Sequence, residues 1–136
     1  MQALRKKAES NIEIYGRQSF EVIREHYASC KALIFPGVED FGIVPVEAMA
    51  SGRPVIAYRG GGALETIIPI SDEVRGGSSG QFFYPKTAEA LVNVVRDFDP
   101  SHFDSQAIQQ HAVQFDITVF RQKMTVCIEK MVSTTS

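Results

Sequence analysis

The fold is decided by residues 32–65, which read ALIFPGVEDFGIVPVEAMASGRPVIAYRGGGALE. The run Ala32–Phe35 is short and apolar, as a buried parallel strand is. A helix is predicted over Ile43–Ser51, with Pro45 tolerated in its first turn. A second strand is predicted over Val55–Ala57, before a run of glycines. The order strand, loop, helix, strand, glycine loop is typical of the wall of a ligand crevice in an open α/β sheet.

Polar groups gather around the predicted loop and the first turn of its helix. The amides of Phe41–Val44 have no intrahelical acceptors, so together with the helix dipole they favour an anion such as a phosphate. Glu47 lies one turn further and suits sugar hydroxyls, because a carboxylate accepts hydrogen bonds and repels anions. Glu39 lies where such folds place reactive groups, and Gly60–Gly62 let backbone approach a ligand closely. The sequence therefore predicts a site for a phosphorylated sugar compound.

Length and composition exclude several functional classes. The 136 residues suffice for one domain with a real core. A net charge of −2 without a long basic run argues against nucleic acid as a partner. The residues after Met1 lack the apolar core expected of a signal peptide, and no apolar stretch approaches the ~20 residues that span a bilayer. Cys30 and Cys127 are predicted to be buried free thiols of a reduced, cytoplasmic protein.

The rest of the chain continues the alternation of strands and helices. A helix over Gln2–Glu9 and a strand over Ile12–Tyr15 are predicted, followed by a helix capped by Ser19. Residues 71–80 form a polar, flexible loop before a strand over Gln81–Tyr84. Thr87, Asp104 and Asp116 are predicted caps of later helices. The expected fold class is α/β, a Rossmann-like open, mainly parallel sheet with flanking helices.

Two features near the carboxyl end are predicted to be structural. Asp97 and Asp99 imitate a DxD metal-binding motif, but they end a helix before a proline instead of following a strand. The last helix is predicted to pack into the core, because its apolar residues recur at helical spacing. These are Phe120, Met124, Cys127, Ile128 and Met131.

A family resemblance enters at Glu39–Glu47. The pattern Glu39, Phe41-Gly42, Pro45, Glu47-Ala48-Met49-Ala50, Gly52, Pro54–Ala57 and Gly61-Gly62 resembles the C-terminal, donor-binding domain of retaining glycosyltransferases of family four. These enzymes have the GT-B architecture of two Rossmann-like halves. The sequence of Glu39–Glu47 is similar to that of bacterial mannosyltransferases that build O-antigen. The resemblance covers nearly all of residues 1–136 as one donor-binding domain, with C-terminal helices at residues 104–132.

The resemblance implies roles for the site residues. Glu47 would hold the ribose of a nucleotide-sugar donor, and Glu39 would be the catalytic residue that contacts the transferred sugar. The amides of Phe41, Gly42, Ile43 and Val44 would meet the sugar and its phosphate. The loop with Arg17 and Ser19 would lie over the nucleobase. Family members usually use no metal or cofactor, and they have glycine where this chain has Asp40.

The resemblance also implies a reaction and its setting. A hexose, such as mannose from GDP-mannose or a sugar from a UDP donor, would pass to a glycan or lipid-linked acceptor in surface polysaccharide synthesis. The enzyme would be cytoplasmic or peripheral at the inner membrane face. In the family, two strands, a basic pair and the acceptor-binding half precede the equivalent of Met1. We therefore expect the isolated chain to be an inactive, self-associating fragment.

The residues also suggest two other functions. A non-catalytic nucleotide-binding or interaction module on the same scaffold stays open, and donor turnover would distinguish it from an enzyme. A nicotinamide dehydrogenase resting on Gly60–Gly62 does not fit, because the order Gly-x-Gly-x-x-Gly is absent. The sequence does not identify the nucleotide, the sugar or the acceptor.

Overall fold

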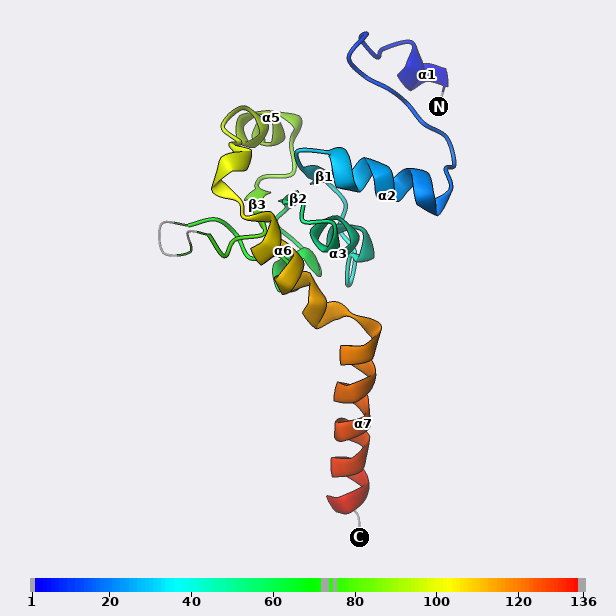
Figure 1. The fold of residues 1–136 in the computed structure, drawn as a ribbon. Coiled ribbons are helices and arrows are strands. Elements are labelled where there is room, and N and C mark those ends of the chain that lie inside the picture. Colours follow the sequence, from blue (N-terminus) through cyan, green and yellow to red (C-terminus); the bar gives the residue numbers. More distant parts are fainter. Residues whose placement is uncertain (1, 72–73, 75, 135–136) are drawn as a thin grey trace.

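A three-stranded parallel sheet lies at the centre of the computed structural model, which describes residues 2–71, 74 and 76–134 (Figure 1). The strands are β1 (Leu33–Phe35), β2 (Val55–Tyr58) and β3 (Gly80–Phe83), in the order β1-β2-β3. Leu33 pairs with Val55, which in turn pairs with Gly80. The expected α/β class with a parallel sheet is confirmed.

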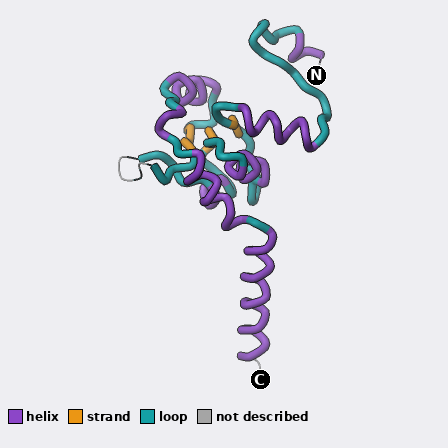
Figure 2. The backbone as a smooth tube through the Cα atoms, viewed as in Figure 1, coloured by secondary structure: helices purple, strands orange, loops and turns teal. Residues whose placement is uncertain are grey.

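Helices surround this sheet, as Figure 2 shows with the strands in orange and the helices in purple. α3 contacts both β1 and β2, and α5 contacts β3. The helices are α1 (Gln2–Arg5), α2 (Phe20–Ser29), α3 (Ile43–Ala50), α4 (Ala63–Thr66), α5 (Ala88–Arg96), α6 (Ser105–Ala112) and α7 (Ile117–Thr134), with short 3-10 turns η1 (Pro100–His102) and η2 (Val113–Phe115).

The core lies where α3 and α6 cover β2. Met49 of α3, Val55 of β2 and Ile108 of α6 belong to one hydrophobic cluster and are almost completely buried. Burying one such side chain contributes about 1.5–3 kcal/mol relative to leaving it exposed. β2 is the middle strand, and its first three residues are all buried, as in a strand covered on both faces. The central strand and the helix before it are thus held firmly together.

Several predicted helix caps are confirmed. The hydroxyl of Thr87 accepts from the amide of Ala90, and Asp104 accepts from two amides at the start of α6. Asp116 accepts from the amide of Thr118 at 2.7 Å. Asp99 of the DxD-like motif caps η1 through the amide of Ser101, which is a structural role. Residues 72, 73 and 75 of the predicted flexible loop lie outside the described residues.

The predicted strand Ile12–Tyr15 is wrong. These residues form an irregular segment in which Ile12 is 52% exposed. A strand needs a hydrogen-bonding neighbour, and within the described residues the sheet consists of β1, β2 and β3 alone. The segment instead folds back toward α1, where Arg5 donates to the carbonyl of Ile14 at 3.3 Å. The first helix is also shorter than predicted and ends at Arg5.

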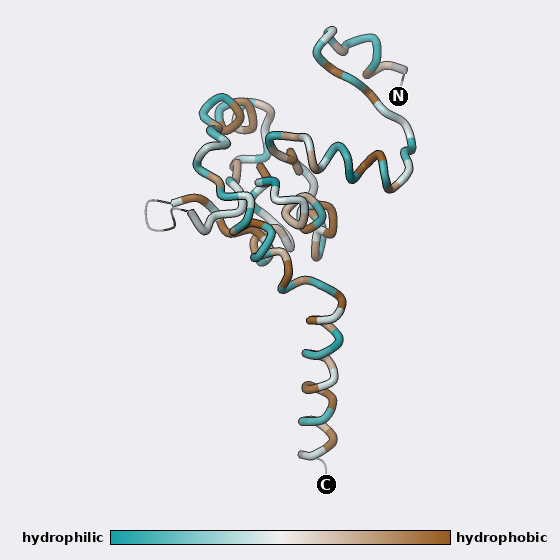
Figure 3. The backbone as a smooth tube through the Cα atoms, viewed as in Figure 1, coloured by the Kyte–Doolittle hydropathy of each residue, from teal (hydrophilic) through white to brown (hydrophobic). Residues whose placement is uncertain are grey.

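The prediction that the last helix packs into the core is also wrong. α7 leaves the body of the molecule after η2 and extends away from it (Figure 1). Apolar and polar residues alternate along it in Figure 3, and Phe120 is 58% exposed. The prediction that both free thiols are buried is wrong as well, because Cys127 is exposed and Cys30 is only half-buried. In the described part of the chain, no helix combines the length and apolarity needed to cross a membrane.

Candidate functional site

Two loops meet at the carboxyl ends of β1 and β2. Because the strands are parallel, the loop with Glu39 and the glycine loop leave the same edge of the sheet. The amide of Gly62 donates to the carbonyl of Glu39 at 2.8 Å. The side chains of Glu39 and Asp40 are exposed to solvent. The backbone of Glu39 is therefore fixed while its carboxylate remains accessible.

The glycines are required by the contact between these loops. Gly61 has φ +62°, and a Cβ added there would lie 2.5 Å from the carbonyl oxygen of Glu39. A Cβ at Gly62 would collide with the backbone of Asp40 and Phe41. No side chain fits in this space. The sequence suggested a close approach of glycine backbone to a ligand, and the structure shows a close approach to the Glu39 loop.

The amino end of α3 presents backbone donors beside that loop. Gly42 is the N-cap, with the left-handed φ of +80°, and it has no side chain to cap the helix. Pro45 has no N–H, so the amides free of intrahelical acceptors are those of Gly42, Ile43 and Val44. Ile43 is 63% exposed, which places this helix end at the surface. Together with the helix dipole, these amides suit an anionic group.

Glu47 lies one turn further along α3 and contacts α2. The hydroxyl of Tyr27 donates to Oε2 of Glu47 at 3.2 Å. Burial and the neighbouring Glu47 carboxylate raise the pKa of Tyr27 to about 12, so its hydroxyl keeps its proton at neutral pH. The contact leaves Oε1 of Glu47 for another donor. Tyr27 was not singled out from the sequence, because its place on the apolar side of α2 does not reveal the hydrogen bond.

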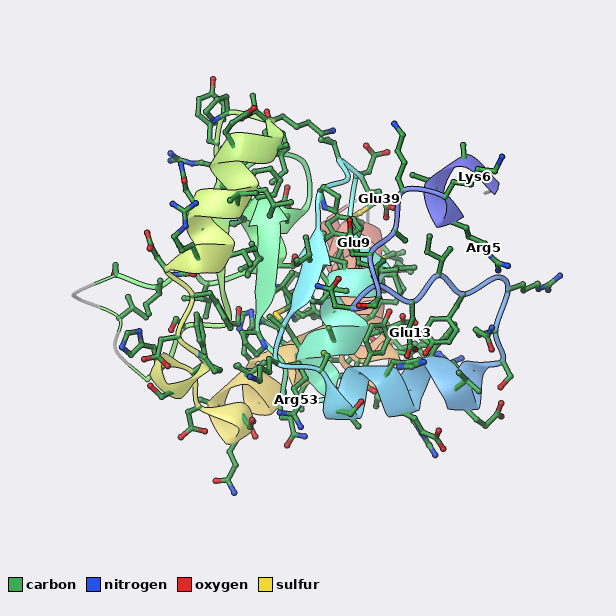
Figure 4. All side chains as sticks on the ribbon, turned by 90° about the horizontal axis from the view of Figure 1, so that it is seen from above. Arg5, Lys6, Glu9, Glu13, Glu39 and Arg53 are labelled. Carbon is green, nitrogen blue, oxygen red and sulfur yellow. The ribbon has the colours of Figure 1, made fainter. Side chains whose placement is uncertain are left out.

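The remaining predicted site residues lie in the segment before and at the start of α2. The Ser19 hydroxyl caps α2 by accepting from the amide of Val22, and Arg17 is exposed. Seen from above, Glu39 and Arg53 lie toward opposite ends of α3 (Figure 4). Arg53 donates to the carbonyl of Ala28, which ties the carboxyl end of α3 to α2. The structure thus joins Glu39, Phe41–Val44 and Glu47 through one loop and helix.

Aromatic contacts join the Glu39 loop to η2. The ring of Phe41 meets that of Phe115 in η2 edge to face, with ring centres 5.9 Å apart. Phe115 also meets the ring of His111 edge to face at 5.6 Å. Neither His111 of α6 nor Phe115 of η2 was singled out from the sequence, because this part of the chain shows only ordinary apolar spacing. The loop therefore rests on residues that are more than 70 positions away in the chain.

Other surfaces of the molecule differ from this site. A hollow of about 850 Å³ lies between β3 and α5, and its lining includes Arg59, Gln81, Tyr84 and Asp97. Among the described residues, no group of three His, Cys, Asp or Glu side chains is arranged to hold a metal ion. The candidate site offers backbone amides as donors and carboxylates as acceptors, a combination that suits a phosphorylated sugar.

Sequence comparison identifies relatives of this chain. A family model described as glycosyl transferases group 1 matches residues 1–101. The alpha-1,3/1,6-mannosyltransferase of Dictyostelium discoideum is 30% identical over 108 residues, which cover 76% of this chain and 24% of that protein. A glycogen synthase of Pelodictyon phaeoclathratiforme is 30% identical over 100 residues, which cover 73% of this chain and 20% of that protein. The chain thus spans a quarter or less of the length of these relatives.

Solved structures share the fold. Sucrose-phosphate synthase from Thermosynechococcus elongatus superposes with a TM-score of 0.78 at 23% identity, over 98% of this chain and 33% of that chain. The Anabaena protein HepE, in complex with UDP-glucose, superposes with a TM-score of 0.69 at 26% identity, over 95% of this chain and 35% of that chain.

Proposed function

Because the chain belongs to the glycosyl transferases group 1 family, we propose that Glu39–Glu47 forms the nucleotide-sugar site of a retaining hexosyltransferase. The observation that carries this proposal is the arrangement of α3. Its uncapped amino end offers amides to a phosphate, and the Glu39 carboxylate stands exposed just before it. Glu47 keeps one oxygen for a ribose hydroxyl while Tyr27 holds the other.

Each group has a distinct role in the proposed reaction. The amides of Gly42, Ile43 and Val44 bind the sugar and its phosphate and stabilise the charge of the departing diphosphate. Glu39 contacts the transferred sugar and stabilises the positive charge that grows on its ring. The bond between the sugar and the diphosphate breaks, the acceptor oxygen bonds to the anomeric carbon, and the acceptor proton leaves with the diphosphate. Binding groups that act mainly on the transition state raise turnover.

The proposed donors are GDP-mannose and UDP-glucose. Mannose as the transferred sugar is supported by the similarity to alpha-1,3/1,6-mannosyltransferases, and UDP-glucose by the structural similarity to HepE in complex with UDP-glucose. The proposed acceptor is a glycan or a lipid-linked sugar, in the cytoplasm or at the inner face of the membrane. We further propose that the chain alone transfers no sugar, and that acceptor binding depends on another domain.

A turnover assay tests this proposal. The whole enzyme that contains this chain is incubated with each labelled donor, and release of the nucleotide is measured with and without candidate glycan acceptors. The proposed activity is supported if the Glu39→Gln variant loses transfer or donor hydrolysis and the Glu89→Gln variant keeps it. Glu89 is a suitable control because it is an exposed carboxylate on α5. Donor binding without any turnover would favour the alternative, a non-catalytic nucleotide-binding module.

A further inference from the structure

His111 is held in one tautomer at the carboxyl end of α6. Its Nε2 lies 2.7 Å from the carbonyl oxygen of Thr66, and its Nδ1 lies 2.7 Å from the side-chain amide nitrogen of Gln114. A carbonyl only accepts, so Nε2 carries the proton and donates it to Thr66. The amide nitrogen of Gln114 only donates, so Nδ1 accepts. The Nε2–H donor of the ring therefore points at α4.

A chain of hydrogen bonds runs from His111 to the backbone of Glu39. The amide and the hydroxyl of Thr66 each donate to the carbonyl of Gly62 at 3.1 Å. The amide of Gly62 donates in turn to the carbonyl of Glu39 at 2.8 Å. α4 is a single turn between these two contacts, and Thr66 is fully buried. This turn thus connects His111 at one end to the backbone of Glu39 at the other.

A second route reaches the same loop through aromatic rings. The His111 ring meets the Phe115 ring at 5.6 Å and an interplanar angle of 85°. The Phe115 ring meets the Phe41 ring at 5.9 Å and 73°. Aromatic rings prefer edge-to-face geometry of this kind to a face-to-face sandwich, so such a pair favours a particular relative orientation. Phe41 follows Glu39 by two positions, so the two series of contacts from His111 end on either side of the exposed Asp40.

The helix that carries His111 is a rigid base. Ile108 is 1% exposed and Ala112 is 6% exposed, and both belong to the core that α6 shares with α3. A side chain on such a helix can hold a loop more exactly than a loop residue can. We propose that His111 is a positioning residue that holds Glu39 toward the transferred sugar through Thr66, Gly62 and Phe115. The inference rests on the role proposed above for Glu39.

Hydrogen exchange on the chain itself tests the first route without any donor. His111→Ala removes the donor to Thr66, and we expect the Gly62 amide to exchange at least about tenfold faster, while the Val55 amide in β2 keeps its rate. His111→Gln places an amide N–H as many bonds from the backbone as Nε2 is, so it should restore the protection of Gly62. Equal Gly62 exchange in the wild type and His111→Ala would overturn the proposal. If His111→Ala does not fold, His111→Phe keeps an aromatic ring beside Phe115 but removes the donor to Thr66, so it is expected to speed Gly62 exchange; unchanged exchange in that variant overturns the first route.

Kinetics of the whole enzyme with UDP-glucose or GDP-mannose test the consequence. His111→Ala should lower kcat by at least about tenfold and leave the donor KM within about threefold, since Glu47 is untouched. His111→Gln should recover most of kcat. Ile108→Val on the same helix is the control for lost stability, and an equal kcat loss there at the same Tm would contradict the proposal. If the wild type turns over neither donor, the proposed function fails, and the exchange result still decides whether His111 holds the loop.

Discussion

At the scale of single residues, the contact between Tyr27 and Glu47 joins α2 to α3 at 3.2 Å. In the proposed site it holds one oxygen of the carboxylate, and the other oxygen would bind the donor. The sequence identified Glu47 by its place one turn into the helix. It did not identify Tyr27 as a partner, because the packing of α2 on α3 depends on contacts across 20 positions.

Glu47→Ala should weaken donor binding by roughly 1.5–3 kcal/mol, the usual scale for a hydrogen bond to a charged group. The chain should remain folded, because the side chain of Glu47 is only half-buried. Titration calorimetry of the wild type and the variant with each donor measures the difference. Equal affinity would remove Glu47 from the site.

Glu39→Gln should lower kcat more than it raises the donor KM, because a negative charge matters most when the sugar ring becomes cationic. Steady-state kinetics with the whole enzyme separate the two constants. A raised KM with an unchanged kcat would make Glu39 a simple binding residue.

Tyr27 predicts a pH dependence of stability. Its pKa is raised from 10.0 to about 12 in the folded state by burial and by Glu47. Its contribution is therefore complete below pH 10 and is lost as the pH rises through about 12. Chemical unfolding of the wild type between these two pH values should show a falling free energy. Tyr27→Phe should show a smaller fall, and parallel curves would contradict the assignment.

At the scale of elements, the sequence predicted β1, α3 and β2 well. Apolar runs that end at Pro36 and open after Pro54, with Pro45 in the first helical turn, are local signals that tertiary contacts do not override. Ile12–Tyr15 alternates like a strand, but strand formation depends on a partner that the local pattern cannot supply. The contact of the glycine loop with Glu39 was also missed, because it joins segments from two different strand ends.

Gly62→Ala tests that loop contact. The added Cβ would meet the backbone of Asp40 and Phe41, so we expect a loss of more than about 1 kcal/mol in the free energy of unfolding. Gly16→Ala is a matched control, since a Cβ there meets nothing within 4 Å. Denaturant unfolding of both variants measures the difference. A similar change in the two would mean that the loops can separate at little cost.

At the scale of the whole molecule, apolar surface remains exposed along α7. Ile117, Phe120 and Ile128 are each more than half exposed. The sequence predicted an apolar helix there, but helical spacing does not say which surface the helix covers. Exposed apolar surface of this kind favours association.

Phe120→Ser combined with Ile128→Ser should therefore reduce self-association of the chain. Light scattering across a range of concentrations gives the mean mass of the wild type and the double variant. Equal mean masses for the wild type and the double variant at every concentration would show that α7 does not mediate association. Val92→Ser on α5 serves as the control, because Val92 is also about half exposed and lies far from α7 in the chain.

The central claim, that α3 and the Glu39 loop bind a nucleotide sugar, is tested most directly by amide NMR of the chain during titration with UDP-glucose and GDP-mannose. We predict that the largest changes in amide chemical shift occur at Gly42, Ile43 and Val44, and that smaller changes extend to Glu47. Shifts confined to the hollow between β3 and α5, around Gln81 and Tyr84, would place the ligand elsewhere and contradict this account.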